Sequence, residues 1–407
     1  MERSVASGLK LSLFNLMIVA LLGTLMRYKI AFSFPVIDQK PMLESHFHFA
    51  FYGWITSCLY MFILKYLEEK RPELKTGIYK NLIAVNFIAA FGMLFSFLLT
   101  GYSAFSIFFI LLALLVSFVF SFTFFRGLKG VRGKAKIWFQ TGLIFAVLSS
   151  VGVLWISYML SNKTVTTDNY LAAHYFFLHF QYNGFFMFSC VGLLIYSLSK
   201  RDIHIGKYQN RVIFWLMFFG CLFGYGLSVL WMNLPLWLYI LVVIAALMQT
   251  TGCVKIYLWV RKNWRKIKET QEPLERTLLI YAGAAFAIKI ALQLGSTVPS
   301  ISHFAFGFRN IVIAYLHLIL LMCISSYLIN RIIDTGYFKI GKAFKFGAIL
   351  FMISVFLNEL VLGVVGMFSI NYTYIPKTHE ILLAITVLIL ISTILIFLGL
   401  KKVKQTD

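Results

Sequence analysis

Histidines are the residues of this sequence whose type and position most favour chemistry. A neutral imidazole binds heme iron and other transition metals, and it titrates near neutral pH. When the long apolar segments are counted as alternating membrane crossings, seven of the eight histidines lie at or near one side, and only His204 lies on the other. The seven are His46, His48, His174, His179, His303, His317 and His379. We therefore treat one side of the chain as the candidate site.

Two of these histidines open copies of one short motif. The first copy reads His48-Phe-Ala-Phe-Tyr-Gly-Trp and the second reads His179-Phe-Gln-Tyr-Asn-Gly-Phe, so both follow the pattern His-Phe-x-aromatic-x-Gly-aromatic. A weaker third copy is Tyr315-Leu-His317. The motif histidines are 131 and 138 residues apart, about a third of the chain each. Repeats of this length indicate an architecture built from similar units.

The spacing of the histidines limits the metal sites that they can form. His46 and His48 are two residues apart and point about 200° from each other on a regular helix, so they would serve two centres on opposite sides. His174 and His179, about 140° apart, are also poorly placed for one shared metal. The sequence contains no His-Glu-x-x-His, so a zinc hydrolase is not indicated. Single histidines on separate helix ends favour axial ligation of heme.

The segments that carry these histidines are membrane helices. The chain has 407 residues, of which 60% are hydrophobic and 13% are charged, and its apolar residues fall in runs of about 20, the length that crosses a bilayer. We predict an all-α polytopic fold, a single transmembrane domain over residues 1–407. The expected spans are 11–26, 44–64, 79–100, 102–125, 137–160, 170–197, 211–231, 236–259, 274–298, 308–330, 343–367 and 379–400.

The distribution of positive charge tests this number of spans. Connecting loops on one side hold 29 lysines and arginines, and those on the other side hold six. The positive-inside rule then predicts about twelve helices with both termini in the cytoplasm, in a bacterial inner membrane. Since the basic residues are spread over short loops, the net charge of +22 does not indicate nucleic acid. The motif histidines fall on spans two, six and ten, which predicts three four-helix pseudo-repeats (about 1–135, 136–270 and 271–407).

This plan resembles subunit I of the heme-copper oxidase superfamily, which includes the large subunit of nitric oxide reductase. The stretch His46-Phe-His48-Phe-Ala-Phe-Tyr-Gly is similar to the His-Gly-His-Leu-Ala-Phe-Tyr-Gly motif of nitric oxide reductases, which there lies on span ten. The stretch from His179 to Gly184 resembles the family's span-six motif, His-Leu-Trp-Val-Glu-Gly. The resemblance covers the whole chain in architecture and about 25 residues in motif.

The resemblance implies one or two b hemes and roles for particular residues. His48 resembles the span-two ligand of the low-spin heme, and His317 resembles its opposite ligand. His179 resembles the first ligand of the active-site copper or non-heme iron, and His46 and His179 would belong to a second, altered site. The family's oxidoreductase activity, of the cytochrome c oxidase or nitric oxide reductase type, would need a diatomic gas and an electron-donor subunit or cytochrome c.

The sequence departs from the family at the catalytic positions. Tyr315 replaces the histidine that would hold the high-spin heme, and Asn183 replaces the glutamate. The paired histidines expected between spans seven and eight are absent from the sequence. Complete reduction of oxygen or nitric oxide therefore lacks its usual ligands, although His174 and His303 are available as substitutes. We expect electron transfer within the membrane or gas binding in a respiratory chain.

Three charged residues are further candidates. Lys289 and Glu359 lie in the middle of spans nine and eleven, where a buried charge is costly and commonly functional. They predict either a proton path or a structural pair between helices. Arg309 opens span ten at the outer surface, where it would meet heme propionates or extend to the lipid interface.

Two other functions stay open at the level of sequence. A secondary transporter would use Lys289 and Glu359 to couple protons or ions, and it would be colourless when purified. A gas- or heme-responsive accessory protein would share the heme but would have no turnover of its own. In all three cases the surrounding partner is the lipid bilayer.

Overall fold

Twelve helices of this chain are long and apolar enough to cross a membrane. The computed structural model describes residues 2–36, 38–369, 373 and 375–403, of which 2, 3 and 303–306 are described by backbone alone. Within that part, the twelve spans confirm the all-α polytopic fold and its order. They are Ser4–Phe32, Gln39–Lys70, Gly77–Thr100, Ala104–Gly127, Lys136–Ser161, Thr167–Ser199, Lys207–Val229, Leu236–Lys262, Pro273–Gly295, Arg309–Asp334, Lys342–Ser369 and Thr378–Leu398.

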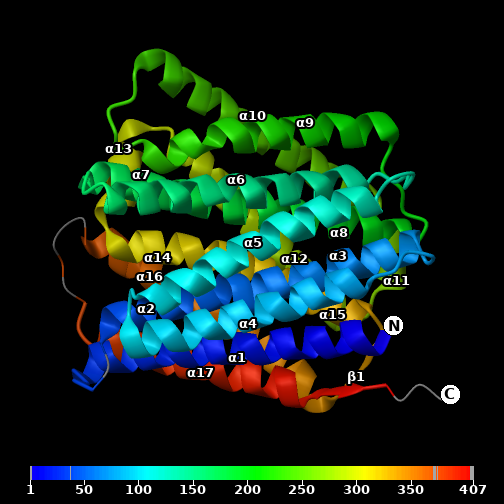
Figure 1. Ribbon diagram of the computed structural model, residues 1–407, viewed down its shortest axis with the longest axis horizontal. Coiled ribbons are helices and arrows are strands. Elements are labelled where there is room, and N and C mark those ends of the chain that lie inside the picture. Colours follow the sequence, from blue (N-terminus) through cyan, green and yellow to red (C-terminus); the bar gives the residue numbers. More distant parts are fainter. Residues whose placement is uncertain (1, 37, 370–372, 374, 404–407) are drawn as a thin grey trace. The chain divides into compact units, whose positions relative to one another are not determined.

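The chain forms two compact units (Figure 1). The first comprises residues 1–129 and 325–407, and the second comprises residues 130–324. The described elements of the first unit are α1 (Glu2–Phe32), α2 (Gln39–His48), η1 (Phe49–Thr56), α3 (Ser57–Lys70), α4 (Gly77–Thr100), α5 (Ala104–Gly127), α15 (Ser326–Asp334), β1 (Phe338–Ile340), α16 (Lys342–Ser369), α17 (Thr378–Leu398) and β2 (Leu400–Lys402).

The second unit contains two short helices between its spans, α11 and α13, and the latter carries His303. The described elements of this unit are α6 (Lys136–Ser161), α7 (Thr167–His179), η2 (Phe180–Phe186), α8 (Met187–Ser199), α9 (Lys207–Gly224), η3 (Tyr225–Val229), α10 (Leu236–Lys262), α11 (Trp264–Thr270), α12 (Pro273–Gly295), α13 (Pro299–Gly307), α14 (Arg309–His317) and η4 (Leu318–Ser325), which ends at the boundary between the units.

The two spans that carry the full histidine motif are the most buried of the twelve. The most apolar stretches of spans two and six are 89% and 83% buried, and no other described span exceeds 61%. A helix surrounded by other helices can carry polar side chains at membrane depth, because protein groups rather than lipid meet them. Spans two and six can therefore hold a polar site.

In the first unit, the two ends of the chain lie together. α1 packs against α17, and α17 packs against α16. The Lys402 ammonium donates to the Ser7 hydroxyl at 2.6 Å, and the Lys10 ammonium donates to the Leu400 carbonyl at 3.3 Å. Figure 1 shows the start of α1 and strand β1 at the same end of this unit. The described ends of the chain therefore lie on one side, as an even number of spans requires.

In the second unit, glycines allow α6 to approach span six closely. A β-carbon added at Gly152 would lie 2.4 Å from the Ala173 carbonyl oxygen and 2.9 Å from the Phe177 amide nitrogen. One added at Gly184 would lie 2.5 Å from the β-carbon of Phe145. Small residues at such crossings let membrane helices gain backbone-to-backbone contact, since lipid supplies little hydrophobic driving force between helices.

The units have different boundaries from the three predicted pseudo-repeats. The units are defined by contacts between elements, whereas the pseudo-repeats are defined by similarity within the sequence. The two sets of boundaries therefore need not coincide. The threefold repeat stays a prediction, and so does the single domain over residues 1–407.

Replacement of Gly152 by alanine is expected to destabilise the protein by about 1–3 kcal/mol, because the new methyl group would overlap backbone atoms that cannot rotate away. The thermal midpoint of detergent-purified protein measures the effect. Gly283→Ala is the matched control, because a β-carbon there meets nothing within 4 Å. Equal midpoints for the two variants would contradict the described packing of α6.

Candidate functional site

A π-helical segment follows each of the three motif histidines. His48 is the last residue of α2 and precedes η1, His179 is the last residue of α7 and precedes η2, and His317 is the last residue of α14 and precedes η4. These π-helices contain seven or eight residues, whereas π-helix accounts for well under 1% of residues in ordinary proteins. Such segments are frequent at functional sites. The sequence predicts regular helices here, and the π segments differ from that prediction.

Side chains from the neighbouring helices hold the first π segment. The Asn15 amide on α1 donates to the Gly53 carbonyl at 2.7 Å, and the Asn86 amide on α4 donates to the Tyr52 carbonyl at 3.1 Å. The Ser57 hydroxyl donates to that same Tyr52 carbonyl at 2.8 Å. Changing the hydrogen-bond ladder inside a membrane requires other donors for the carbonyls, because lipid offers none. These two asparagines therefore fix the backbone directly after His48.

A hydrogen bond links the first π segment to Ser325, the residue at which the first unit resumes. The Trp54 indole in η1 donates to the hydroxyl of Ser325, the last residue of η4, at 2.8 Å. Both side chains are buried. The contact holds the segment that follows His48 against the start of the C-terminal part of its own unit.

His46 has the surroundings of an axial ligand. Its Nδ1 lies 3.0 Å from the Val19 carbonyl oxygen on α1, so Nδ1 carries the proton and donates it. Within the described residues, no hydrogen-bond partner meets Nε2. Gly23 lies beside the ring, and a β-carbon there would be 3.4 Å from Cε1. Metal-binding histidines commonly donate one N–H to a carbonyl in this way, which leaves the other nitrogen as the ligand.

His48 faces the opposite side of the helix, as the spacing predicted. Its ring stacks on Phe97 of α4 with centroids 4.9 Å apart, whereas His46 faces α1. Its Nε2 lies 3.8 Å from a carboxylate oxygen of Glu44, which also accepts the Tyr102 hydroxyl at 3.0 Å. A carboxylate beside an imidazole orients the ring and favours its protonated form. To ligate iron through Nε2, His48 would have to turn away from Glu44.

His179 differs from His46 because protein groups bind both of its nitrogens. Nε2 donates to the Cys221 carbonyl at 2.8 Å, and Nδ1 accepts from the Asn183 amide at 3.1 Å. The ring is fully buried. In this arrangement His179 offers no nitrogen to a metal. Asn183, which stands where the family has glutamate, is thus the residue that occupies Nδ1.

A buried polar chain continues from His179 across spans seven, eight and nine. The Gln249 amide on α10 donates to the Gly220 carbonyl at 2.7 Å, one residue before Cys221. The Lys289 ammonium on α12 meets the Gln249 carbonyl oxygen at 3.5 Å. It also lies within electrostatic range of His179 and of the thiols of Cys221, Cys253 and Cys323. Lys289 is only 1% exposed, so its charge is placed inside the protein.

Glu359 has partners of its own in the first unit. Its carboxylate accepts the Asn358 amide at 3.0 Å and lies in the field of Arg27. Lys289 meets Gln249 within the second unit. A pair between Lys289 and Glu359 stays a prediction, and each residue has a described neighbour without it.

The remaining predicted residues lie on three helices of the second unit. His174 is half-buried on α7, with its ring stacked on Tyr170 at 6.3 Å. Tyr315 and His317 are half-buried on α14, and Tyr315 lies within electrostatic range of Tyr182 in η2. Arg309 opens α14 and is exposed. The side chain of His303 lies outside the described residues.

No group of three or more histidine, cysteine, aspartate or glutamate side chains able to hold a metal occurs among the described residues. Single axial ligation of heme needs no such group, whereas a three-ligand copper or iron centre does. The heme, copper and iron assignments stay predictions. His48 belongs to the first unit and His317 to the second.

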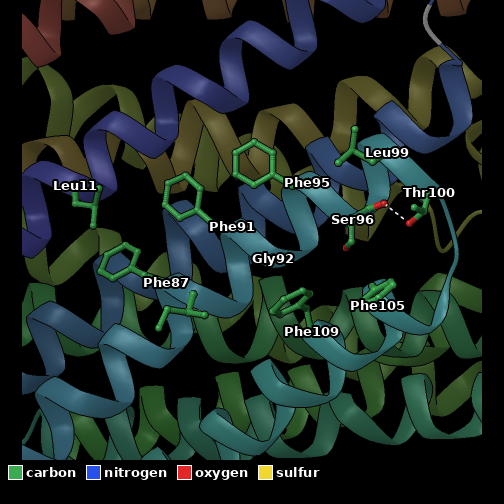
Figure 2. Close-up of a pocket in the computed structure, with 11 residues that line it drawn as sticks. Leu11, Phe87, Phe91, Gly92, Phe95, Ser96, Leu99, Thr100, Phe105 and Phe109 are labelled. Atoms are coloured by element: carbon green, nitrogen blue, oxygen red, sulfur yellow. Dashed lines mark hydrogen bonds between the residues drawn. The ribbon is translucent and has the colours of Figure 1, made fainter.

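A separate apolar groove lies on the first unit, between α4 and α5 (Figure 2). Its volume is about 710 Å³. Figure 2 shows Phe87, Phe91 and Phe95 along α4, with Phe105 and Phe109 on α5. No charged side chain lines the groove. A surface of this kind suits lipid acyl chains and offers no group for catalysis.

No protein-family model matches the chain, and a search of curated proteins finds no similar protein.

Replacement of Asn86 by leucine is expected to lower stability by about 1–3 kcal/mol, because the Tyr52 carbonyl loses a donor at membrane depth. The thermal midpoint in detergent measures the loss. Asn162→Leu is the matched control, since that amide is exposed at the end of α6. An equal decrease in both variants would show that the π segment does not depend on Asn86.

Proposed function

We propose that this chain is a heme-binding membrane protein with the plan of heme-copper oxidase subunit I. The observation that carries the proposal is the recurrence of a histidine followed directly by a π-helical segment on spans two, six and ten. Two of these spans are the most buried in the described chain. A histidine and π segment repeated on three spans fits a protein that holds flat macrocycles between its helices.

His46 fits a heme ligand best among the described histidines. Its ring is held by Val19 through Nδ1, and Nε2 is directed away from that bond. In the proposal, His48 and His317 clamp one low-spin b heme and His46 belongs to a second site. Bound heme would supply one-electron iron chemistry, and Arg309 would supply a cation for the propionates.

His179 fits a supporting role better than a metal ligand. Both nitrogens are used within the protein, by Cys221 and by Asn183. The proposed activity is therefore electron transfer within the membrane, or binding of a diatomic gas, without the three-ligand centre that reduction requires. A donor subunit or cytochrome c would supply the electrons. An accessory protein that senses gas or heme without turnover would use the same residues.

The termini are proposed to lie in the cytoplasm of a bacterial cell, with the protein in its inner membrane. The two described chain ends meet on one side of the first unit. In the alternation that the sequence predicts, the loops on the same side as the termini hold 29 lysines and arginines. Positive loops are retained on the cytoplasmic side during insertion, which orients the histidines outward.

A reduced-minus-oxidised spectrum of detergent-purified protein, expressed with adequate heme, tests the proposal. We expect Soret and alpha bands of b-type heme. His48→Ala and His317→Ala should each abolish the low-spin signal, because bis-imidazole ligation needs both rings. His46→Ala should keep that signal and lower the heme content by about half, since one of two sites is lost.

His204→Ala is the control for these variants, because His204 is exposed in the loop between α8 and α9. It should retain the full spectrum. Colourless wild-type protein would end the heme proposal. Survival of the low-spin signal in both the His48 and the His317 variants would reject that ligand pair.

The buried chain from Lys289 favours a second candidate, a transporter coupled to protons or ions. Lys289 meets Gln249, Gln249 donates to the Gly220 carbonyl on span seven, and the next residue, Cys221, accepts from His179. Within the described residues, Lys289 forms no ion pair, and its one hydrogen bond joins it to an amide. An ammonium held at membrane depth by neutral groups is suited to exchange protons or to meet an anion.

Replacement of Lys289 by methionine separates the two candidates. If the protein is a transporter, proton-coupled flux in proteoliposomes should fall about tenfold or more, because the coupling charge is removed. Stability should be unchanged or higher, since the apolar stem remains and a buried charge is lost. Lys255→Met, a second lysine within a span, is the control. Wild-type flux indistinguishable from that of empty liposomes would reject the transporter.

A further inference from the structure

A lysine-bearing β-ribbon closes one end of the first unit. Strands β1 and β2 pair antiparallel, with Phe338 opposite Lys402, Lys339 opposite Lys401 and Ile340 opposite Leu400. Successive side chains of a strand point to opposite faces. Phe338 and Leu400 are buried on one face, so Lys339 and Lys401 project together from the other, and both are exposed.

This arrangement places like charges directly across from each other. β-carbons of opposed residues are about 5 Å apart in an antiparallel pair, and like charges there are destabilising. A ribbon of three residues per strand has few hydrogen bonds to offset that repulsion. Two backbone hydrogen bonds at its ends add to the ladder, from the Gly341 amide to the Gly399 carbonyl at 3.1 Å and from the Val403 amide to the Tyr337 carbonyl at 3.0 Å.

Two further exposed lysines, Lys342 and Lys345, follow on the first turn of α16. Within the described residues, no carboxylate pairs with them or with Lys339 and Lys401. Lys402 and Lys10 differ, because they bind Ser7 and the Leu400 carbonyl. We call Lys339, Lys342, Lys345 and Lys401 the ribbon lysines. Their charge has no partner in the described chain.

The position of the ribbon identifies the class of its partner. It connects to the start of span eleven and the end of span twelve, so it lies where apolar helices reach the surface. Phospholipid headgroups occupy that level of a bilayer. We propose that the ribbon lysines bind the phosphates of anionic phospholipids, and that a headgroup between Lys339 and Lys401 relieves their repulsion. This inference is independent of heme binding and of transport.

The double variant K339Q/K401Q tests the proposal. Wild-type protein in nanodiscs should unfold at a higher temperature when about one lipid in four is phosphatidylglycerol than in pure phosphatidylcholine, since each lysine favours an anionic surface. The variant should lose most of that increase, and its affinity for phosphatidylglycerol by native mass spectrometry should fall about 25-fold, or about fivefold per lysine. In pure phosphatidylcholine it should be at least as stable as wild type.

Three controls make the result specific. K262Q/K266Q removes two lysines from another positively charged connecting segment, outside the ribbon, and it should keep the lipid effect. K339R/K401R keeps both charges and should also keep it. Inorganic phosphate, added to wild-type protein in detergent without lipid, should leave the unfolding temperature unchanged. An equal loss in K262Q/K266Q, a lipid effect retained in K339Q/K401Q, or stabilisation by phosphate alone would each overturn the proposal.

Discussion

The backbone's need for hydrogen-bond partners inside the membrane governs the candidate site. A π-helical segment departs from the regular ladder, and lipid cannot satisfy the carbonyls that it displaces. Asn15 and Asn86 satisfy two of them after His48, from helices on either side. Asn15 on α1 and Asn86 on α4 thus lie beside the backbone carbonyls of the π segment in span two. The burial of span two agrees with this need for hydrogen-bond partners, because helices that surround the span carry the Asn15 and Asn86 amides.

Hydrogen bonding also gives different surroundings to the motif histidines His48 and His179 and to their neighbour His46. His46 gives Nδ1 to a carbonyl and keeps Nε2 for another partner, while His179 is bound through both nitrogens. His48 lies between these cases, beside the carboxylate of Glu44. The same residue type can therefore keep one nitrogen for a further partner, lie beside a carboxylate or bind protein groups through both nitrogens. The neighbouring helix decides which role is available.

Lysine side chains occupy two opposite environments in this molecule. Lys289 is buried among neutral groups, where desolvation makes its charge costly and therefore sensitive to any partner. The ribbon lysines are exposed at the end of the helices, where their charge is not desolvated. The first arrangement suits a function inside the membrane, and the second suits a contact with its surface. Net charge alone does not distinguish the two.

The sequence by itself determined the twelve spans, their order and the opposite directions of His46 and His48, because apolar length, loop charge and helical angle are local properties. It also found the three histidine motifs. Only the tertiary structure revealed the π segments, the asparagines that hold them and the two bonds that occupy His179. Those features depend on helices that are distant in sequence, such as α1 and α4 around span two. The local sequence of span two does not indicate which side chains of those helices donate hydrogen bonds to it. The contact between Lys289 and Gln249 also came only from the tertiary structure. The sequence indicates that a charge on Lys289 is costly to bury, but it does not indicate which side chain lies beside it.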